Sequence, residues 1–226
     1  MRKYSKSIVV GLFAFCLSYA SWGQGLSFSY LIPKSGYLSA PVSPFSIRGI
    51  GIDFGPFIGV DTGLTLYYMS GLGMSGLPFP SEEPLVGPQF SLMVPLELSL
   101  GVKVGIVSVR VLGGGFGLWH LNTRINQGNM DRALRDAEDW VVLNADLSLN
   151  NQLGGGWLAG IAFDWHVSKD FSISTEFRYL DGSSGAALTG SYTGAPSDGQ
   201  LITRDVDYAD ARIDVEGLEI SLGVSF

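Results

Sequence analysis

Apolar and polar residues alternate without interruption through residues 90–104. The even-numbered positions from Phe90 to Val104 are all apolar, while the odd positions between them include Glu97 and Lys103. A period of two predicts a β-strand with one apolar and one polar face, because successive side chains of a strand point to opposite sides. In a helix the same residues would spread the charges around the cylinder. We therefore expect a strand here.

The same alternation recurs along the chain and predicts eight strands. They are expected at residues 26–32, 45–59, 62–70, 89–103, 106–120, 155–167, 171–181 and 211–226. Their lengths are near the 9–11 residues that a tilted strand needs to cross a bilayer. The alternation of residues 141–149 leaves three alternatives open: a β-extension of a loop, a longer sixth strand, or an added hairpin that would make ten strands.

Short and long connections alternate between these strands. Tight turns are expected at residues 60–62, 104–105 and 168–170. Long loops are expected at about residues 33–44, 71–88, 121–154 and 182–210. Short periplasmic turns and long outer loops are typical of bacterial outer-membrane barrels. The pattern predicts an all-β fold, an eight-stranded antiparallel transmembrane β-barrel of up-and-down order, with both termini in the periplasm.

The turn positions predict which residues face each other. A turn centred on Val104–Gly105 would place three apolar pairs on the outer face and Glu97 diagonal to Arg110 on the inner face. A turn around Lys169 would place Trp165 opposite Ile173 and Phe163 opposite Thr175. We also expect a bulge or local defect at Pro95, and a bulge or sharp coiling at Gly113–Gly115.

The inward faces carry charges of both signs. An eight-stranded barrel has room inside only for side chains, so we expect a polar plug and no open channel. The predicted interior network comprises Asp53, Glu97, Lys103, Arg110, Asp164, Glu176, Arg178 and Glu219. Aromatic girdles are expected at the two edges of the bilayer. They comprise Trp119 and Trp157 at the outer edge and Trp165, Phe171 and Phe226 at the inner edge.

The last nine residues carry the most specific motif. Their apolar side chains fall on one face, and the chain ends on an aromatic residue: Leu218, Ile220, Leu222, Val224 and Phe226. This pattern resembles the C-terminal signature of Gram-negative outer-membrane β-barrels, which marks the closing strand for the insertion machinery. From Gln24 onward the chain resembles the OmpA/OmpX-like family of small outer-membrane β-barrel proteins. The resemblance implies a role in envelope structure, in adhesion or binding, or as an accessory subunit.

The N-terminus and the composition narrow the class further. Residues 1–23 are expected to be a signal peptide, with three basic residues, an apolar run over residues 8–17, and cleavage before Gln24. These 23 residues hold three of the 14 basic residues and none of the 21 acidic ones, which leaves the remainder with a formal charge of −10. So acidic a chain is a poor candidate for binding nucleic acid. Cys16 is the sole cysteine, so the remainder offers no disulfide or thiolate metal site.

Two histidines are candidates for a catalytic group. His120 precedes a loop with Asp131, Asp136, Glu138 and Asp139, so a His–carboxylate base could form there, but no nucleophile accompanies it at a diagnostic spacing. The same loop holds an expected short helix at residues 130–139. His166 and Ser168 are similar to the His-x-Ser pair of outer-membrane lipid A 3-O-deacylases. That pair would lie at the periplasmic end, so we interpret His166 as an ordinary inward side chain.

A set of acidic residues near the last loop is a candidate calcium site. It comprises Asp205, Asp207, Asp210 and Asp214. Oxygen-rich clusters can bind Ca²⁺, but no EF-hand-type spacing is present and Arg204 and Arg212 offset part of the charge. We interpret the set as a solvated acidic loop and expect no cofactor.

The sequence favours a non-enzymatic outer-membrane barrel that acts through its outer loops. Its expected partners are outer-membrane lipids and lipopolysaccharide, the barrel insertion machinery, and a surface protein bound by the loops. Two alternatives stay open: a lipid A-modifying enzyme that uses His120, and a narrow channel.

Overall fold

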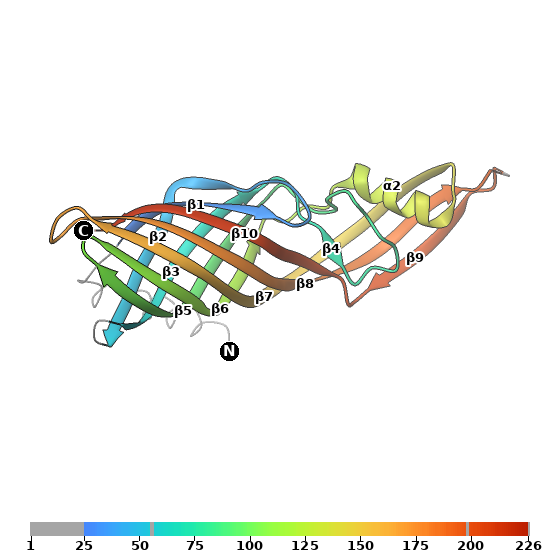
Figure 1. Ribbon diagram of the computed structural model, residues 1–226. Helices are drawn as coiled ribbons and strands as arrows, with labels where there is room; N and C mark the ends of the chain where they lie inside the picture. Colours follow the sequence, from blue (N-terminus) through green and yellow to red (C-terminus); the bar gives the residue numbers. More distant parts are fainter. Residues whose placement is uncertain (1–24, 55–56, 198, 226) are drawn as a thin grey trace, which may run out of the picture.

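The computed structural model describes residues 25–225 except 55–56 and 198 (Figure 1). The expected signal peptide and Phe226 lie outside the described residues, as does the side chain of Asp53. The described part holds ten strands and one helix, in the order β1 Gly25–Pro33, β2 Ala40–Phe54, β3 Ile58–Met69, β4 Met74–Ser75, β5 Gln89–Val104, β6 Val107–Leu121, α2 Gln127–Glu138, β7 Val142–His166, β8 Ser172–Ala195, β9 Ile202–Tyr208 and β10 Arg212–Ser225.

Eight of these strands form a ring of antiparallel neighbours. The order is β1-β2-β3-β5-β6-β7-β8-β10, and β10 pairs with both β8 and β1, so the ring returns to its start. Seven of the ring strands show alternating burial over much of their length. In β1, for example, Ser27, Ser29 and Leu31 are buried while Phe28 and Tyr30 are exposed. In the eighth, β2, some of the side chains lie outside the described set. The prediction of eight antiparallel strands from the period of two is confirmed.

The turn between β5 and β6 lies one residue later than expected. Val104 pairs with Val107, so the turn residues are Gly105 and Ile106, and Gly105 has a φ of +64° that glycine adopts at low cost. Every pair is therefore shifted, and Glu97 lies opposite Gly114 instead of diagonal to Arg110. The apolar face is preserved, because moving the turn by one residue changes each pairing by two. The second predicted register, with Trp165 opposite Ile173 and Phe163 opposite Thr175, is confirmed.

The turn expected between the second and third strands is wrong. The tight turn expected at residues 60–62 is part of β3, and the connection falls between Phe54 and Ile58. That connection contains a Gly-Pro pair in the sequence, the residue types that favour turns. As a result Asp61 belongs to a strand and faces the interior, where its carboxylate accepts a hydrogen bond from Ser99 at 2.8 Å.

The irregularity expected at Pro95 is present. The pairing of β3 with β5 is interrupted beside Pro95, between the pairs Thr62–Leu96 and Thr65–Met93, and the Thr62 hydroxyl donates to the Pro95 carbonyl at 2.6 Å. This is a local defect, as expected for a residue without an N–H group. Gly113–Gly115, in contrast, pairs in unbroken register on both sides, so of the two alternatives expected there the bulge is wrong, and sharp coiling stays a prediction.

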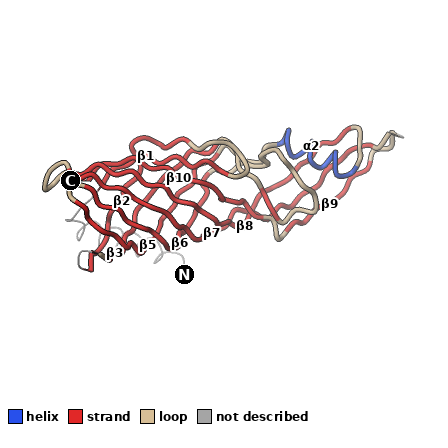
Figure 2. The backbone as a smooth tube through the Cα atoms, viewed as in Figure 1, coloured by secondary structure: helices blue, strands red, loops and turns tan. Residues whose placement is uncertain are grey.

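Much of what was expected as loop is ordered into a projecting unit. β7 and β8 have 25 and 24 residues and continue well beyond the ring, where β9 pairs with β8 and α2 covers one side (Figures 1 and 2). We call this unit, which comprises residues 122–153 and 185–211, the extension. Of the three alternatives for residues 141–149, the longer sixth ring strand is the one observed. Within the described residues, no helix is both long and apolar enough to cross a membrane.

A β-bulge in β7 joins the extension to the ring. The pairs Asn151–Ala186 and Gly154–Ser184 differ by one residue in register, so β7 carries one extra residue there. A bulge of this kind reverses which side of the strand faces inward. The buried residues of β7 are accordingly odd-numbered in the extension, such as Leu143 and Leu147, and even-numbered in the ring, such as Leu158.

The helix begins earlier than expected and is longer. It spans Gln127–Glu138 instead of residues 130–139, because Asn126 caps its N-terminus through a hydrogen bond from the Asn129 N–H at 3.4 Å. The Asp131 carboxylate accepts a hydrogen bond from the backbone N–H of Ala145 in β7 at 2.9 Å. This bond ties the helix to the sheet of the extension.

Glycines allow close approach of β7 to β8. A Cβ atom on Gly156 would lie 2.1 Å from the backbone oxygen of Asp181, whereas a Cβ atom on Gly117 would meet nothing within 4 Å. We expect Gly156→Ala to lower the free energy of unfolding by about 1–3 kcal/mol, because the strands must move apart. Gly117→Ala is the matched control and should stay within about 0.5 kcal/mol of the parent. Denaturant unfolding followed by tryptophan fluorescence measures both, and equal stabilities would contradict the packing described here.

Candidate functional site

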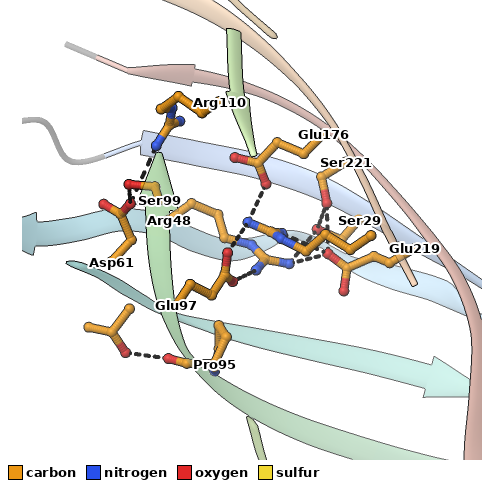
Figure 3. Close-up of polar contacts among 12 residues, drawn as sticks. Ser29, Arg48, Asp61, Pro95, Glu97, Ser99, Arg110, Glu176, Glu219 and Ser221 are labelled. Carbon is orange, nitrogen blue, oxygen red and sulfur yellow. Dashed lines mark hydrogen bonds and ion pairs between the residues drawn. The ribbon is translucent and has the colours of Figure 1, made fainter. Parts of the chain in front are cut away.

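An ionic network fills the ring interior on the side of the short turns (Figure 3). Arg178 of β8 lies 3.2 Å from Glu97 of β5, 2.6 Å from Glu176 and 3.1 Å from Glu219 of β10. Arg48 of β2 forms a second ion pair with Glu219 and lies 3.7 Å from Glu97. Four strands therefore meet through five charged side chains, all of them buried.

Hydroxyl groups complete the surroundings of Glu219. Its carboxylate accepts hydrogen bonds from Tyr67 and, at 2.9 Å, from Ser221. Ser29 bonds to Ser221 at 2.7 Å and accepts from Arg48 at 3.3 Å. A buried carboxylate is costly unless its oxygens are paired, and here both oxygens have partners.

A second polar group lies nearer the short turns. Arg110 of β6 donates to Asp164 of β7 at 2.8 Å and to Asp61 of β3 at 3.4 Å. Lys103 is exposed at the end of β5 and, within the described part of the chain, takes part in no ion pair of the interior. The structure thus joins Glu97, Glu176, Arg178 and Glu219, places Arg110 and Asp164 together elsewhere, and leaves Lys103 apart.

Sequence reasoning missed three members of these groups. Arg48 lies in β2 where the register with β3 shifts between Ile47 and Ile50, so alternation gives no direction there. Asp61 was expected in a turn. Tyr67 carried a usable signal, because it shares the odd face of β3 with Thr65, whereas Leu64 and Leu66 occupy the even face.

Between the ionic network and the extension the ring interior is mainly apolar, whereas only a polar plug was expected. One cluster fills this part of the ring and comprises Leu31, Tyr67, Met69, Leu72, Val86, Met93, Phe116, Leu118, Leu158, Leu180, Ala186, Ile213 and Val215. Leu72 and Val86 belong to the connection between β3 and β5, and backbone bridges link them to each other, to Gly36 and to Ile125. The connecting segments therefore cover the end of the ring that bears the extension.

His120 lies within this buried region and not among the carboxylates of its loop. Its Nδ1 atom is 2.7 Å from the Ser91 hydroxyl and 3.1 Å from the side-chain nitrogen of Gln89. Ser91 and His120 are 0% and 2% exposed. The candidate His–carboxylate base is thus not formed, and bulk solvent does not reach the Ser–His contact.

His166 connects three strands at the opposite end of the ring. Its Nε2 atom is 2.7 Å from the Ser108 hydroxyl of β6, and its Nδ1 atom is 2.8 Å from the Ser172 hydroxyl of β8. Ser168 instead accepts from the backbone N–H of Asp170 at 3.3 Å. The His-x-Ser pair therefore makes no mutual hydrogen bond, and both ring nitrogens of His166 are occupied.

The four aspartates of the candidate calcium site do not act together. Asp214 accepts a hydrogen bond from Ser75 at 2.8 Å, Asp205 and Asp207 are exposed on β9, and Asp210 follows that strand. In the described ranges, no group of three or more His, Cys, Asp or Glu side chains is arranged to hold a metal ion.

The described aromatic residues of the expected girdles point outward in two sets. Trp119 and Trp157 lie on the ring strands toward the extension, and Trp165 and Phe171 lie beside the short turn between β7 and β8. Trp157 packs against Tyr179 with tilted rings whose centroids are 5.8 Å apart, and it donates to Asp181 at 3.2 Å. The apolar residues of β10 also expected as an insertion signal, Leu218, Ile220, Leu222 and Val224, share one face opposite the buried Glu219 and Ser221.

The extension packs around a second apolar cluster, to which Phe79 and Leu85 of the connection between β3 and β5 also belong. Trp140 packs against Tyr192 and lies 5.5 Å from the guanidinium of Arg204. Glu138 accepts a hydrogen bond from Tyr192 at 2.5 Å and pairs with Arg204 at 2.7 Å. Burial and this hydrogen bond raise the pKa of Tyr192 to about 12. The extension is therefore a packed unit and not a set of independent loops.

Comparison with known proteins gives distant structural likenesses. No family model and no curated relative matches the chain. The outer membrane protein OprG from Pseudomonas aeruginosa is 14% identical, with a TM-score of 0.46 over 88% of this chain and 95% of that one. A major outer membrane protein from Thermus thermophilus is 11% identical, with a TM-score of 0.40 over 90% and 98%. Ail, the attachment invasion locus protein of Yersinia pestis, is 10% identical, with a TM-score of 0.36 over 90% and 93%.

Proposed function

We propose that this chain is a non-enzymatic β-barrel of a bacterial outer membrane that presents the extension outside the cell as a binding surface. The observation that carries the proposal is the outward face of the ring. Leu96, Val111 and Leu222 there are 62%, 58% and 54% exposed, and most of their outward neighbours are apolar as well. A continuous apolar surface of this extent is unusual for a soluble monomer but is the normal lipid-facing band of a membrane barrel.

The inside-out distribution of polarity supports the same proposal. Five charged side chains are buried inside the ring, while apolar side chains cover its outside. Lipid cannot satisfy polar backbone or side-chain groups, so a membrane barrel must pair them internally. The two outward aromatic sets fit the two edges of a bilayer. The short turns would then face the periplasm, and the extension would face the exterior.

The order within the extension favours binding as its role. Its two long strands, its helix and its apolar cluster hold one shape above the ring, so a surface on it is organised before any partner arrives. No observation favours either of the two alternatives, a lipid A-modifying enzyme or a narrow channel. Ser91 and His120 are buried, which argues against a lipid-modifying enzyme, and side chains fill the interior, which argues against an open channel.

The orientation can be tested in intact cells. A site-specific protease sequence inserted in the connection between β8 and β9 should be cut when protease is added to whole cells. The same sequence inserted at Lys169, in the turn between β7 and β8, should be cut only after the outer membrane is permeabilised. The Lys169 insertion is the matched control for expression and protease activity. Cleavage of both insertions in intact cells, of neither, or of the Lys169 site alone would contradict the proposal.

A further inference from the structure

The sheet of the extension has one buried face and one face without cover. β7, β8 and β9 lie side by side there, and Leu143, Leu147 and Tyr192 of the inner face pack into the apolar cluster. The alternate residues of each strand point to the other face, where cross-strand neighbours form regular rows. One row is Asp146–Ser191–Asp205, and the next is Ser148–Thr189–Asp207. We call this surface the acidic face.

The charge of the acidic face is not compensated. Asp146, Asp205 and Asp207 are exposed, and none of them forms an ion pair with another described residue. Arg204, the basic residue next to Asp205 in β9, points to the other face and forms an ion pair with Glu138. Three carboxylates therefore lie on a surface of hydroxyl groups with no cation among them.

The strand that carries two of these carboxylates also has a free edge. β9 is the last strand of the sheet order and pairs only with β8 within the described residues. Its seven residues are in regular register, without a bulge or a proline. In an antiparallel pair the N–H and C=O groups of alternate residues point away from the partner, so half of them are directed outward here. Such an edge is a template for another strand.

A free strand edge beside uncompensated carboxylates fits an extended, basic peptide segment. We propose that β9 binds an extended segment of a partner protein that carries Lys or Arg at alternate positions. The segment would add a strand next to β9 through backbone hydrogen bonds. The Cβ atoms of its basic residues would then lie about 5 Å from those of Asp205 and Asp207, the usual distance between cross-strand neighbours. This rests on the proposed function in one respect, that the extension faces the exterior.

Self-association through the same edge is disfavoured by the sequence of β9. Two copies paired antiparallel about the middle of the strand would place Asp205 opposite the same residue of the other copy. Like charges directly opposite destabilise a strand pair. The same charges attract a basic segment, so the edge distinguishes between a second copy of this chain and a basic partner.

The test is a binding measurement on the purified full-length protein in lipid nanodiscs. The probe is a labelled peptide in which lysine alternates with valine and threonine, followed by fluorescence anisotropy. Asp205→Asn with Asp207→Asn should weaken binding about tenfold, because two exposed ion pairs are lost. Asp136→Asn with Asp139→Asn, at the end of α2, removes the same charge elsewhere and should leave the affinity within about twofold of the parent.

A second probe separates strand addition from charge alone. A peptide of the same sequence with methylated amides along the edge that faces β9 keeps all its lysines but cannot donate to the strand, and it should lose most of its affinity. Equal binding of the methylated peptide, or equal loss in both aspartate variants, would overturn the inference. The whole-cell protease test is independent of these binding measurements. An extension that is not cleaved in intact cells would refute the proposed function even if the purified protein bound the peptide.

Discussion

Replacing Arg178 by alanine is expected to lower the free energy of unfolding by about 3–5 kcal/mol, because it leaves buried carboxylates without their cation. Arg178 contacts Glu97, Glu176 and Glu219, and its side chain is 4% exposed. Arg48 would remain beside Glu219, but Glu176 has no other ion pair in the described part of the chain. Arg178 thus connects β8 with both β5 and β10.

The matched control is Arg135→Ala on the surface of α2. Arg135 is 42% exposed and lies 3.5 Å from Asp136, so its loss should cost less than about 1 kcal/mol. Urea unfolding of the protein folded in lipid vesicles, followed by tryptophan fluorescence, gives both values. If the two variants are equally stable, the network of β2, β5, β8 and β10 does not hold the ring together as described.

Replacing Trp140 by alanine is expected to unfold the extension while the ring stays intact. The indole packs over Gly194, where a Cβ atom would lie 2.2 Å from its ring, and it contacts Tyr192 and Arg204. Removing a buried tryptophan commonly costs about 3–5 kcal/mol. The loss should remain local, because residues 154–166 of β7 and 172–184 of β8 keep their partners within the ring.

Hydrogen exchange measured by mass spectrometry distinguishes local from global unfolding. In the Trp140→Ala variant, amides of β9 and of α2 should exchange faster, while those of β5 and β6 should keep the protection of the parent. Val141→Ala, at an exposed neighbouring position, is the control and should change neither set. Faster exchange throughout the ring would mean that the extension and the ring fold as one cooperative unit.

The period of two predicts which side of a strand is inward, but not which residue of the next strand it meets. The β5–β6 hairpin illustrates this limit. Moving the turn by one residue changes every pairing by two positions, and each apolar side chain stays on the outer face. Glu97 therefore kept its expected direction but found Arg48 and Arg178 instead of Arg110. The facing was predictable from the sequence, whereas the ion pairs were not.

The extension shows a second limit. The alternating apolar residues are at odd positions in both residues 141–149 and residues 155–167, so the sequence shows no change of phase. In the structure, however, the odd positions are buried in the extension and exposed in the ring, as Leu143 and Trp157 illustrate. The reversal of facing comes from the bulge, which adds one residue to β7. The bulge at Asn151–Gly154 is recognised only when β8 is seen to pair continuously with both parts.

By itself the sequence determined the eight strands of the ring, their inward and outward faces and the apolar exterior, because these follow from the direction of successive side chains along one strand. The tertiary structure alone decided the pairing of Glu219 with Arg178, the entry of Arg48 and Tyr67 into the network, and the free edge of β9. Glu219 and Arg178 lie directly opposite each other on β10 and β8. Contacts between residues so far apart in the chain depend on how the ring closes, which local patterns do not encode.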